Sequence, residues 1–169
     1  MNMAEAVKSV LTKYVGFSGR ARRSEYWYWT LATILVTIAV ALFESALGIR
    51  YDDSGPISAV LGLAIFLPGL AVTFRRLHDT GRSGWWVGGF YLAIIVFVFV
   101  AVTMALGVGT DVGNASSMLA GFGVLTLLFF LGLFIYAIVL LIFMCQDSHT
   151  GPNKYGPNPK NEGNYDVFG

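Results

Sequence analysis

Four long apolar stretches constrain this chain more than any other feature. They cover residues 26–47, 57–74, 85–106 and 118–145 of the 169-residue sequence, and the last three contain no charged side chain. A helix of about 20 apolar residues crosses the hydrocarbon layer of a bilayer, where lipid cannot satisfy backbone polar groups. The sequence therefore predicts an all-α, polytopic membrane protein with four transmembrane helices.

Composition and charge narrow the class of protein further. Hydrophobic residues make up 56% of the chain and charged residues 12%, about half the charged share of an ordinary soluble domain. These values exclude a disordered chain, a coiled coil and nearly all soluble enzymes. The formal net charge of +1 gives no reason to expect a nucleic-acid partner, and the single cysteine, Cys145, cannot form an internal disulfide.

The second apolar stretch, residues 57–74, is the shortest of the four. Its 18 residues reach about 27 Å as a helix, and Pro68 interrupts the backbone hydrogen bonding. A full span and a re-entrant segment are both compatible with this length.

The first stretch contains Glu44, the one acidic or basic residue in the four stretches, close to the end that we expect to face the outside.

The basic residues are distributed unevenly between the two sides of the predicted bundle. Of the eleven lysines and arginines, only Arg50 falls on one side, and all four tryptophans lie at the opposite interface. Because cytoplasmic loops carry an excess of Lys and Arg, both termini are predicted to lie in the cytoplasm. The other ten basic residues are Lys8, Lys13, Arg20, Arg22, Arg23, Arg75, Arg76, Arg82, Lys154 and Lys160.

Residues 1–25 form a polar lead before the first span. Apolar residues recur in it at helical spacing, with Lys8 and Lys13 on the other face. We predict an amphipathic interfacial helix here, lying in the headgroup plane. Packing of its apolar stripe against the bundle or a partner is the alternative. The stripe consists of Met3, Ala6, Val7, Val10, Leu11 and Tyr14.

The chain thus divides into three parts. These are a cytoplasmic amphipathic helix with a basic lead at 1–25, a four-helix transmembrane domain at 26–145 and a cytoplasmic tail at 146–169. A cleaved signal peptide is not expected, because the first apolar stretch is longer than the roughly 7 to 15 residues of a signal-peptide core.

Three polar stretches meet at the predicted cytoplasmic surface, at residues 17–27, 75–86 and 146–159. The second reads RRLHDTGRSGWW, and the third contains NKYGP at 153–157. On a small hydrophobic chain, these stretches resemble DUF805, a family of bacterial inner-membrane proteins of unknown function, over about residues 16–159. The resemblance implies four helices and a bacterial inner-membrane location, and it supplies no catalytic residues.

The cations of these stretches suggest an anion site. Guanidinium groups bind phosphate bidentately, and neighbouring acidic side chains can orient them. An anionic lipid headgroup, a phosphate compound or an acidic protein segment fits such a site, and the lipid bilayer is the expected environment. The candidate ligand-binding residues are Arg20, Arg23, Arg75, Arg76, Arg82 and Lys154, with Glu25, His78, Asp79 and Asp147 as orienting partners.

Other interpretations of the same residues remain open. Arg75, Arg76 and Gly81 also suit a purely structural helix end. A metal site from His78, Asp79, Asp147 and His149 lacks the usual spacing of metal ligands, and no cofactor fingerprint is present, so neither a metal nor a cofactor is expected.

We therefore favour a non-enzymatic membrane protein. A membrane enzyme acting on a phosphorylated lipid, with His78 or Asp79 as base, comes next, then a small channel or transporter. Transmembrane glycines also permit a homo-oligomer.

The predicted orientation is tested by cysteine labelling in a Cys145→Ser background. An impermeant thiol reagent added outside intact cells is expected to label a cysteine at position 53 and to leave one at position 80 unlabelled. The opposite pattern would mean that the topology is inverted.

Overall fold

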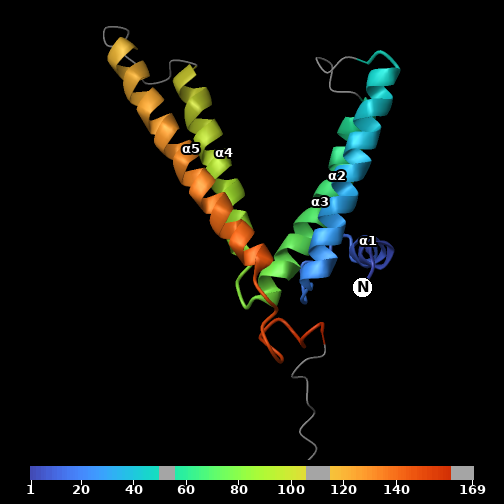
Figure 1. Ribbon diagram of the computed structural model, residues 1–169. Coiled ribbons are helices and arrows are strands. Elements are labelled where there is room, and N and C mark those ends of the chain that lie inside the picture. Colours follow the sequence, from blue (N-terminus) through green and yellow to red (C-terminus); the bar gives the residue numbers. More distant parts are fainter. Residues whose placement is uncertain (50–55, 106–114, 161–169) are drawn as a thin grey trace, which may run out of the picture. The chain divides into compact units, whose positions relative to one another are not determined.

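The computed structural model of the chain describes residues 1–49, 56–105 and 115–160. These residues form helices without any named strand (Figure 1). Four of the helices are long and apolar enough to cross a membrane, which confirms the predicted all-helical class and the four spans. The helices are α1 (Met3–Thr12), α2 (Arg23–Ala46), α3 (Pro56–Asp79), α4 (Trp85–Ala105) and α5 (Ala115–Cys145).

The second span is a continuous helix. α3 has 24 residues and passes through Pro68, so it is about 36 Å long at 1.5 Å per residue. The sequence estimate for this span was shorter because it stopped before Arg75, whereas the helix continues through the charged residues to Asp79. Its end is a Schellman motif: the Arg82 N–H donates to the Leu77 carbonyl, and Gly81 has a φ of 78°.

The helices belong to two compact units. One unit contains α1, α2, α3 and the segment from Met144 onward, and the other contains α4 and α5. In the second unit, Phe97 stacks on Phe129 with ring centroids 4.2 Å apart, and the Tyr136 hydroxyl donates to the Trp86 carbonyl at 2.7 Å. The candidate site lies entirely within the first unit.

At the far end of the α2–α3 pair, Glu44 caps α3. Its carboxylate accepts hydrogen bonds from the backbone N–H groups of Ile57 at 2.9 Å and Ser58 at 3.0 Å, and from the Ser58 hydroxyl. A carboxylate at a helix start satisfies orphan N–H groups and complements the positive end of the helix dipole. The one acidic residue inside the apolar stretches therefore joins the two helices.

Helix α1 packs across α2 and α3 near their polar ends (Figure 1). Its start is a capping box between Asn2 and Glu5. Only Ala6 and Val10 of α1 are buried, and Val10 joins Trp29 of α2 and Val72 of α3 in an apolar cluster. Other members of the predicted apolar stripe, including Met3 and Leu11, remain exposed.

A proline in α3 creates the second attachment of α1. Pro68 has no N–H, so the carbonyl of Ala64, four residues earlier, loses its normal helical donor. The Tyr14 hydroxyl, just beyond α1, donates to this carbonyl. The phenol therefore satisfies a backbone group that the proline leaves open.

This pairing predicts a coupled pair of mutations. Tyr14→Phe is expected to lower the free energy of unfolding by about 1 kcal/mol, the usual value of one hydrogen bond. In a Pro68→Ala background the restored N–H can satisfy Ala64, so the same change should have little effect. Unfolding of the purified protein in detergent measures both, with Tyr28→Phe as a control on an exposed tyrosine of α2. Equal effects in the two backgrounds would contradict the pairing.

Candidate functional site at the polar ends of α2 and α3

The Asp79 carboxylate is the centre of a buried charge cluster. Asp79 ends α3 and has no solvent exposure. It accepts hydrogen bonds from Nε of Arg20 at 2.9 Å, Nη1 of Arg76 at 2.5 Å and the Ser148 hydroxyl at 2.6 Å. One carboxylate thus joins α3, the linker before α2 and the segment after α5. We call these four residues the Asp79 cluster.

Arg20 finds acceptors for every nitrogen of its guanidinium. Nη1 donates to the carbonyls of Gly151 at 2.8 Å and Gly156 at 3.2 Å, and Nη2 donates to those of His149 at 2.6 Å and Asp79 at 3.4 Å. Gly151 and Gly156 have φ angles of 72° and 133°, which side chains disfavour. The turns that present these carbonyls therefore depend on glycine.

Arg76 is satisfied in the same way. Its Nε donates to the Met144 carbonyl at 3.2 Å and its Nη2 to the Gln146 carbonyl. The side chains of Arg20 and Arg76 are 1% and 0% exposed. Arg20 and Arg76, two of the six candidate cations, therefore point into the protein, and their N–H groups donate hydrogen bonds to acceptors within the chain.

Residues 146–160, which we call the tail cap, close over the end of α3. The Tyr155 ring stacks on His78 with centroids 3.8 Å apart, and the Asn153 amide donates to the His78 carbonyl at 2.9 Å. On the other side, Nδ1 of His78 lies 3.2 Å from the Gly19 carbonyl. His78 is thereby held between the linker and the tail cap.

Arg75 is buried in a different setting from its neighbour Arg76. Its Nη2 lies 3.6 Å from Oε1 of Glu25, and the two side chains are 1% and 5% exposed. The Ser9 hydroxyl of α1 donates to the same Glu25 oxygen at 3.1 Å. Among the described residues, none of the three Arg75 guanidinium nitrogens has a hydrogen-bond acceptor.

A second ion pair lies at the surface. Nη2 of Arg23 lies 2.6 Å from Asp147, and Nζ of Lys160 lies 3.1 Å from the same carboxylate oxygen. The hydrogen bond from Lys160, with the charge of Arg23 nearby, lowers the pKa of Asp147 below its ordinary value. This contact therefore stabilises the tail cap above the ordinary pKa of Asp and is lost as the pH falls through the lowered pKa.

The remaining two candidate cations are Arg82, which contacts the tail cap, and Lys154, which belongs to it. Nη1 of Arg82 donates to Oε1 of Gln146 at 2.6 Å. Lys154 is exposed, with its Nζ 4.9 Å from the centroid of the Tyr155 ring. Within the described ranges no three His, Cys, Asp or Glu side chains gather as metal ligands do, and Asp79 and Asp147 belong to separate ion pairs.

The structure thus separates the ten sequence-derived residues. Arg20, Arg76, Asp79 and His78 lie together under the tail cap, Arg75 and Glu25 form a pair under α1, and Arg23, Asp147, Arg82 and Lys154 lie toward the surface. Sequence reasoning missed Ser9, Ser148, Gln146 and Tyr155. The NKYGP run was the available signal, since it supplies Asn153, Tyr155 and Gly156 to these contacts.

These segments lie within a region that matches a known protein family. The family described as "Protein of unknown function (DUF805)" matches residues 14–157, which include the linker, all four spans and most of the tail cap. The chain belongs to this family. The chain is 35% identical to the inner membrane protein YhaH of Escherichia coli K12 over 154 residues, covering 90% of this chain and 94% of YhaH.

A second E. coli K12 relative, the inner membrane protein YhaI, is 37% identical over 152 residues, covering 90% of this chain and 92% of YhaI. The match to YiiR of E. coli K12 is shorter, at 32% identity over 93 residues. No solved structure matches the chain. Together with the four spans, these relatives support an integral membrane protein of the inner-membrane class.

The Asp79 cluster predicts a large stability loss on Asp79→Asn. This change leaves two buried guanidinium groups without their counter-charge, a loss of about 3 to 5 kcal/mol. Trypsin should then cleave the tail cap at Lys154 and Lys160 faster in open membrane vesicles, and thermal unfolding should shift downward. Asp147→Asn, which breaks an exposed pair with Arg23 and Lys160, is the matched control: it should shift thermal unfolding little and leave cleavage at Lys154 unchanged. Equal behaviour of the two variants would exclude the cluster as the element that holds the tail cap.

Proposed function

We propose that this chain is a non-enzymatic inner-membrane protein, with both termini in the cytoplasm, whose cytoplasmic face binds an anionic lipid surface. The orientation of α1 is the observation that carries the proposal. Inner-membrane relatives and the positions of the basic residues support the location and the topology.

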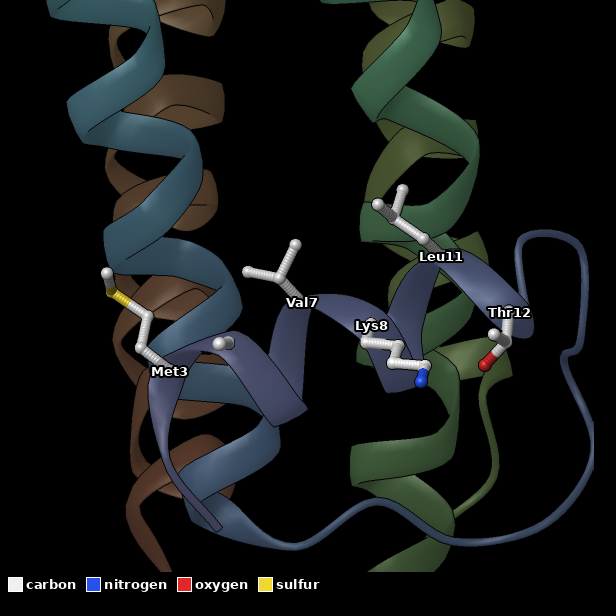
Figure 2. Close-up of a pocket in the computed structure, with 6 residues that line it drawn as sticks. Met3, Val7, Lys8, Leu11 and Thr12 are labelled. Carbon is white, nitrogen blue, oxygen red and sulfur yellow. The ribbon is translucent and has the colours of Figure 1, made fainter.

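Helix α1 has an apolar side on which Met3 and Leu11 are exposed, while Val7 is partly buried against the cluster of Val10, Trp29 and Val72. Met3, Val7 and Leu11 point along α2 and α3 in the direction in which α2 runs, and the Lys8 ammonium points the opposite way (Figure 2). Met3 and Leu11 are 41% and 49% exposed. In the proposed orientation, the exposed apolar side chains enter the edge of the hydrocarbon and Lys8 stays in the headgroup layer.

The level of α1 on the bundle agrees with this arrangement. Val10 of α1 packs beside the buried Trp29 of α2, and Trp27, two residues earlier on α2, is exposed as a tryptophan of an interfacial aromatic belt would be. Small buried side chains fix α1 to α2 and α3, and larger apolar ones are left for lipid. α1 therefore serves both sequence alternatives at once: part of its stripe packs on the bundle and part faces the membrane.

Exposed cations supply the electrostatic part of the interaction. Lys8, Lys13 and Lys154 are exposed, and the Arg23 side chain is 42% exposed. Basic residues near an anionic surface each contribute about 1 kcal/mol, an effect that salt screens. This set replaces the six-cation site expected from sequence, because Arg20 and Arg76 are already bound internally.

The geometry does not favour the enzyme alternative. A general base needs a free lone pair within reach of substrate. Asp79 accepts from three donors and is fully buried, and the ring of His78 lies against Tyr155. The Asp79 carboxylate is therefore not free to take a proton from a substrate, and the His78 ring is held by its contacts with Gly19 and Tyr155.

Spin labels on α1 test the membrane contact in the full-length protein. In a Cys145→Ser background reconstituted in bilayer discs, a nitroxide at position 11 is expected to be more accessible to oxygen, which concentrates in lipid. A nitroxide at position 8 should be more accessible to a water-soluble nickel chelate. Equal nickel accessibility at both positions would exclude the interfacial orientation.

The lipid preference has its own test. Replacing Lys8 and Lys13 together with Gln should reduce the enrichment of phosphatidylglycerol around the purified protein on the order of fivefold per lysine at low salt. Glu5→Gln, on the same helix, is the control and should not reduce it. An unchanged enrichment would mean that these cations bind something else, such as an acidic protein segment.

A further inference from the structure

We propose that Arg75 and Glu25 form a site, covered by α1, for a zwitterionic phospholipid headgroup that carries a primary ammonium. The phosphate oxygens would bind Arg75, and the ammonium would bind Glu25. The proposal rests on the interfacial position of α1 given above and adds a specific ligand to it.

The unsatisfied guanidinium of Arg75 is the first observation. The side chain is 1% exposed, yet its Nε, Nη1 and Nη2 have no hydrogen-bond acceptor among the described residues. Buried polar groups are normally paired, and an unpaired charged group carries a large desolvation cost. Arg20 and Arg76, in the same unit and equally buried, are fully supplied with acceptors. Of these three buried arginines, Arg75 is therefore the one whose guanidinium lacks hydrogen-bond acceptors.

The chemistry of the missing acceptor follows from the guanidinium. Its parallel N–H groups match two oxygens of a phosphate in a bidentate contact. Helix α1 contributes the Ser9 hydroxyl to Glu25, and the linker contributes the Ala21 N–H to the Arg75 carbonyl, but neither segment supplies an acceptor to the Arg75 guanidinium. The acceptors for Arg75 must then come from a group outside these helices.

Glu25 selects the charge of that group. Its carboxylate lies 3.6 Å from Arg75, so a simple anion bound at Arg75 would also meet a negative charge at close range. A ligand with its own positive group avoids this repulsion. A primary ammonium donates hydrogen bonds to a carboxylate, whereas the quaternary ammonium of phosphocholine has no N–H to donate. The pair therefore favours phosphoethanolamine over phosphocholine.

The position of the pair suits a headgroup. Glu25 precedes Trp29 by four residues, about 6 Å along α2 at 1.5 Å per residue. The pair thus lies on the polar side of Trp29, in the first turn of α2, where the proposed position of α1 puts the headgroup layer. The cover is light, because α1 buries only Ala6 and Val10. A headgroup that displaces the Ser9 contact gains access without unpacking large side chains.

The test compares two lipids that differ in the methyl groups of the headgroup nitrogen. Full-length protein is reconstituted in an equimolar mixture of phosphatidylethanolamine and phosphatidylcholine, and the lipids retained after purification are quantified by mass spectrometry. We expect enrichment of phosphatidylethanolamine of about tenfold, the size of one charged hydrogen bond. Glu25→Gln should abolish the preference between the two lipids, and Arg75→Gln should reduce retention of both.

The matched control is Asp147→Asn, which alters another Arg–acid pair in the same unit and should leave the preference unchanged. If the single variants of the buried pair fail to accumulate, the double variant Glu25→Leu/Arg75→Leu replaces it with apolar side chains, a change that proteins tolerate better than loss of one partner. It should fold and show no preference.

Three outcomes would overturn the proposal. The first is no preference for phosphatidylethanolamine in the wild-type protein, and the second is a preference that survives in the double variant. The third is an increase in unfolding temperature with soluble phosphoethanolamine as large as that with the lipid, which would point to a soluble ligand. Failure of the membrane position of α1 is distinguishable, because the spin labels at positions 8 and 11 report it directly. The variant in which Lys8 and Lys13 are replaced with Gln should keep its preference for phosphatidylethanolamine.

Discussion

The polar end of this protein depends on one buried carboxylate placed between two guanidinium groups. Asp79 has no exposure and faces Arg20 and Arg76, so an ionised acid is removed from water together with two cations. Such a group is tolerable only when every partner is hydrogen-bonded, because a buried charge without its partner costs several kcal/mol. The excess positive charge is met by backbone carbonyls of the tail cap, including Gly151 and Gly156. The linker before α2 and the tail cap are thereby fixed to α3 by the same requirement.

One face of α3 carries the change from an apolar to a charged environment. Pro68, Val72, Arg75 and Asp79 follow one another at intervals of three or four residues, and all are buried. Residues at this spacing share a helix face. Each of these residues has a partner from another segment. Tyr14 donates to the carbonyl that Pro68 leaves open, and Trp29 packs against Val72. Glu25 pairs with Arg75, and Arg20 pairs with Asp79. From Val72 to Asp79 the contacts change from apolar packing to buried ion pairs, so α3 is the element on which the linker, α1 and the tail cap are aligned.

Sequence reasoning predicted the four spans and a helix-closing role for Gly81, because these depend on local patterns, although it ended the second span before Arg75. Apolar length predicts the spans, and Gly81 marks the left-handed residue that closes α3. Sequence could not assign the arginines. Long side chains such as that of Arg20 bind carbonyls about 130 residues away, and a carbonyl has no residue type that a pattern can recognise. Periodicity likewise predicted α1 but not the division of its stripe, because Val10 and Leu11 are equally apolar and only packing separates them.

The contrast between Arg75 and Arg76 follows from what covers each of them. The two residues are adjacent, are buried to the same extent and each face one carboxylate. Arg76 lies beside the end of α5, where the carbonyls of Met144, in the last helical turn, and Gln146, just beyond it, accept its N–H groups. Arg75 lies beside Glu25 of α2, and no described carbonyl accepts a hydrogen bond from its guanidinium. The chain therefore completes the site of Arg76 internally and leaves the acceptors of Arg75 to a group from its surroundings.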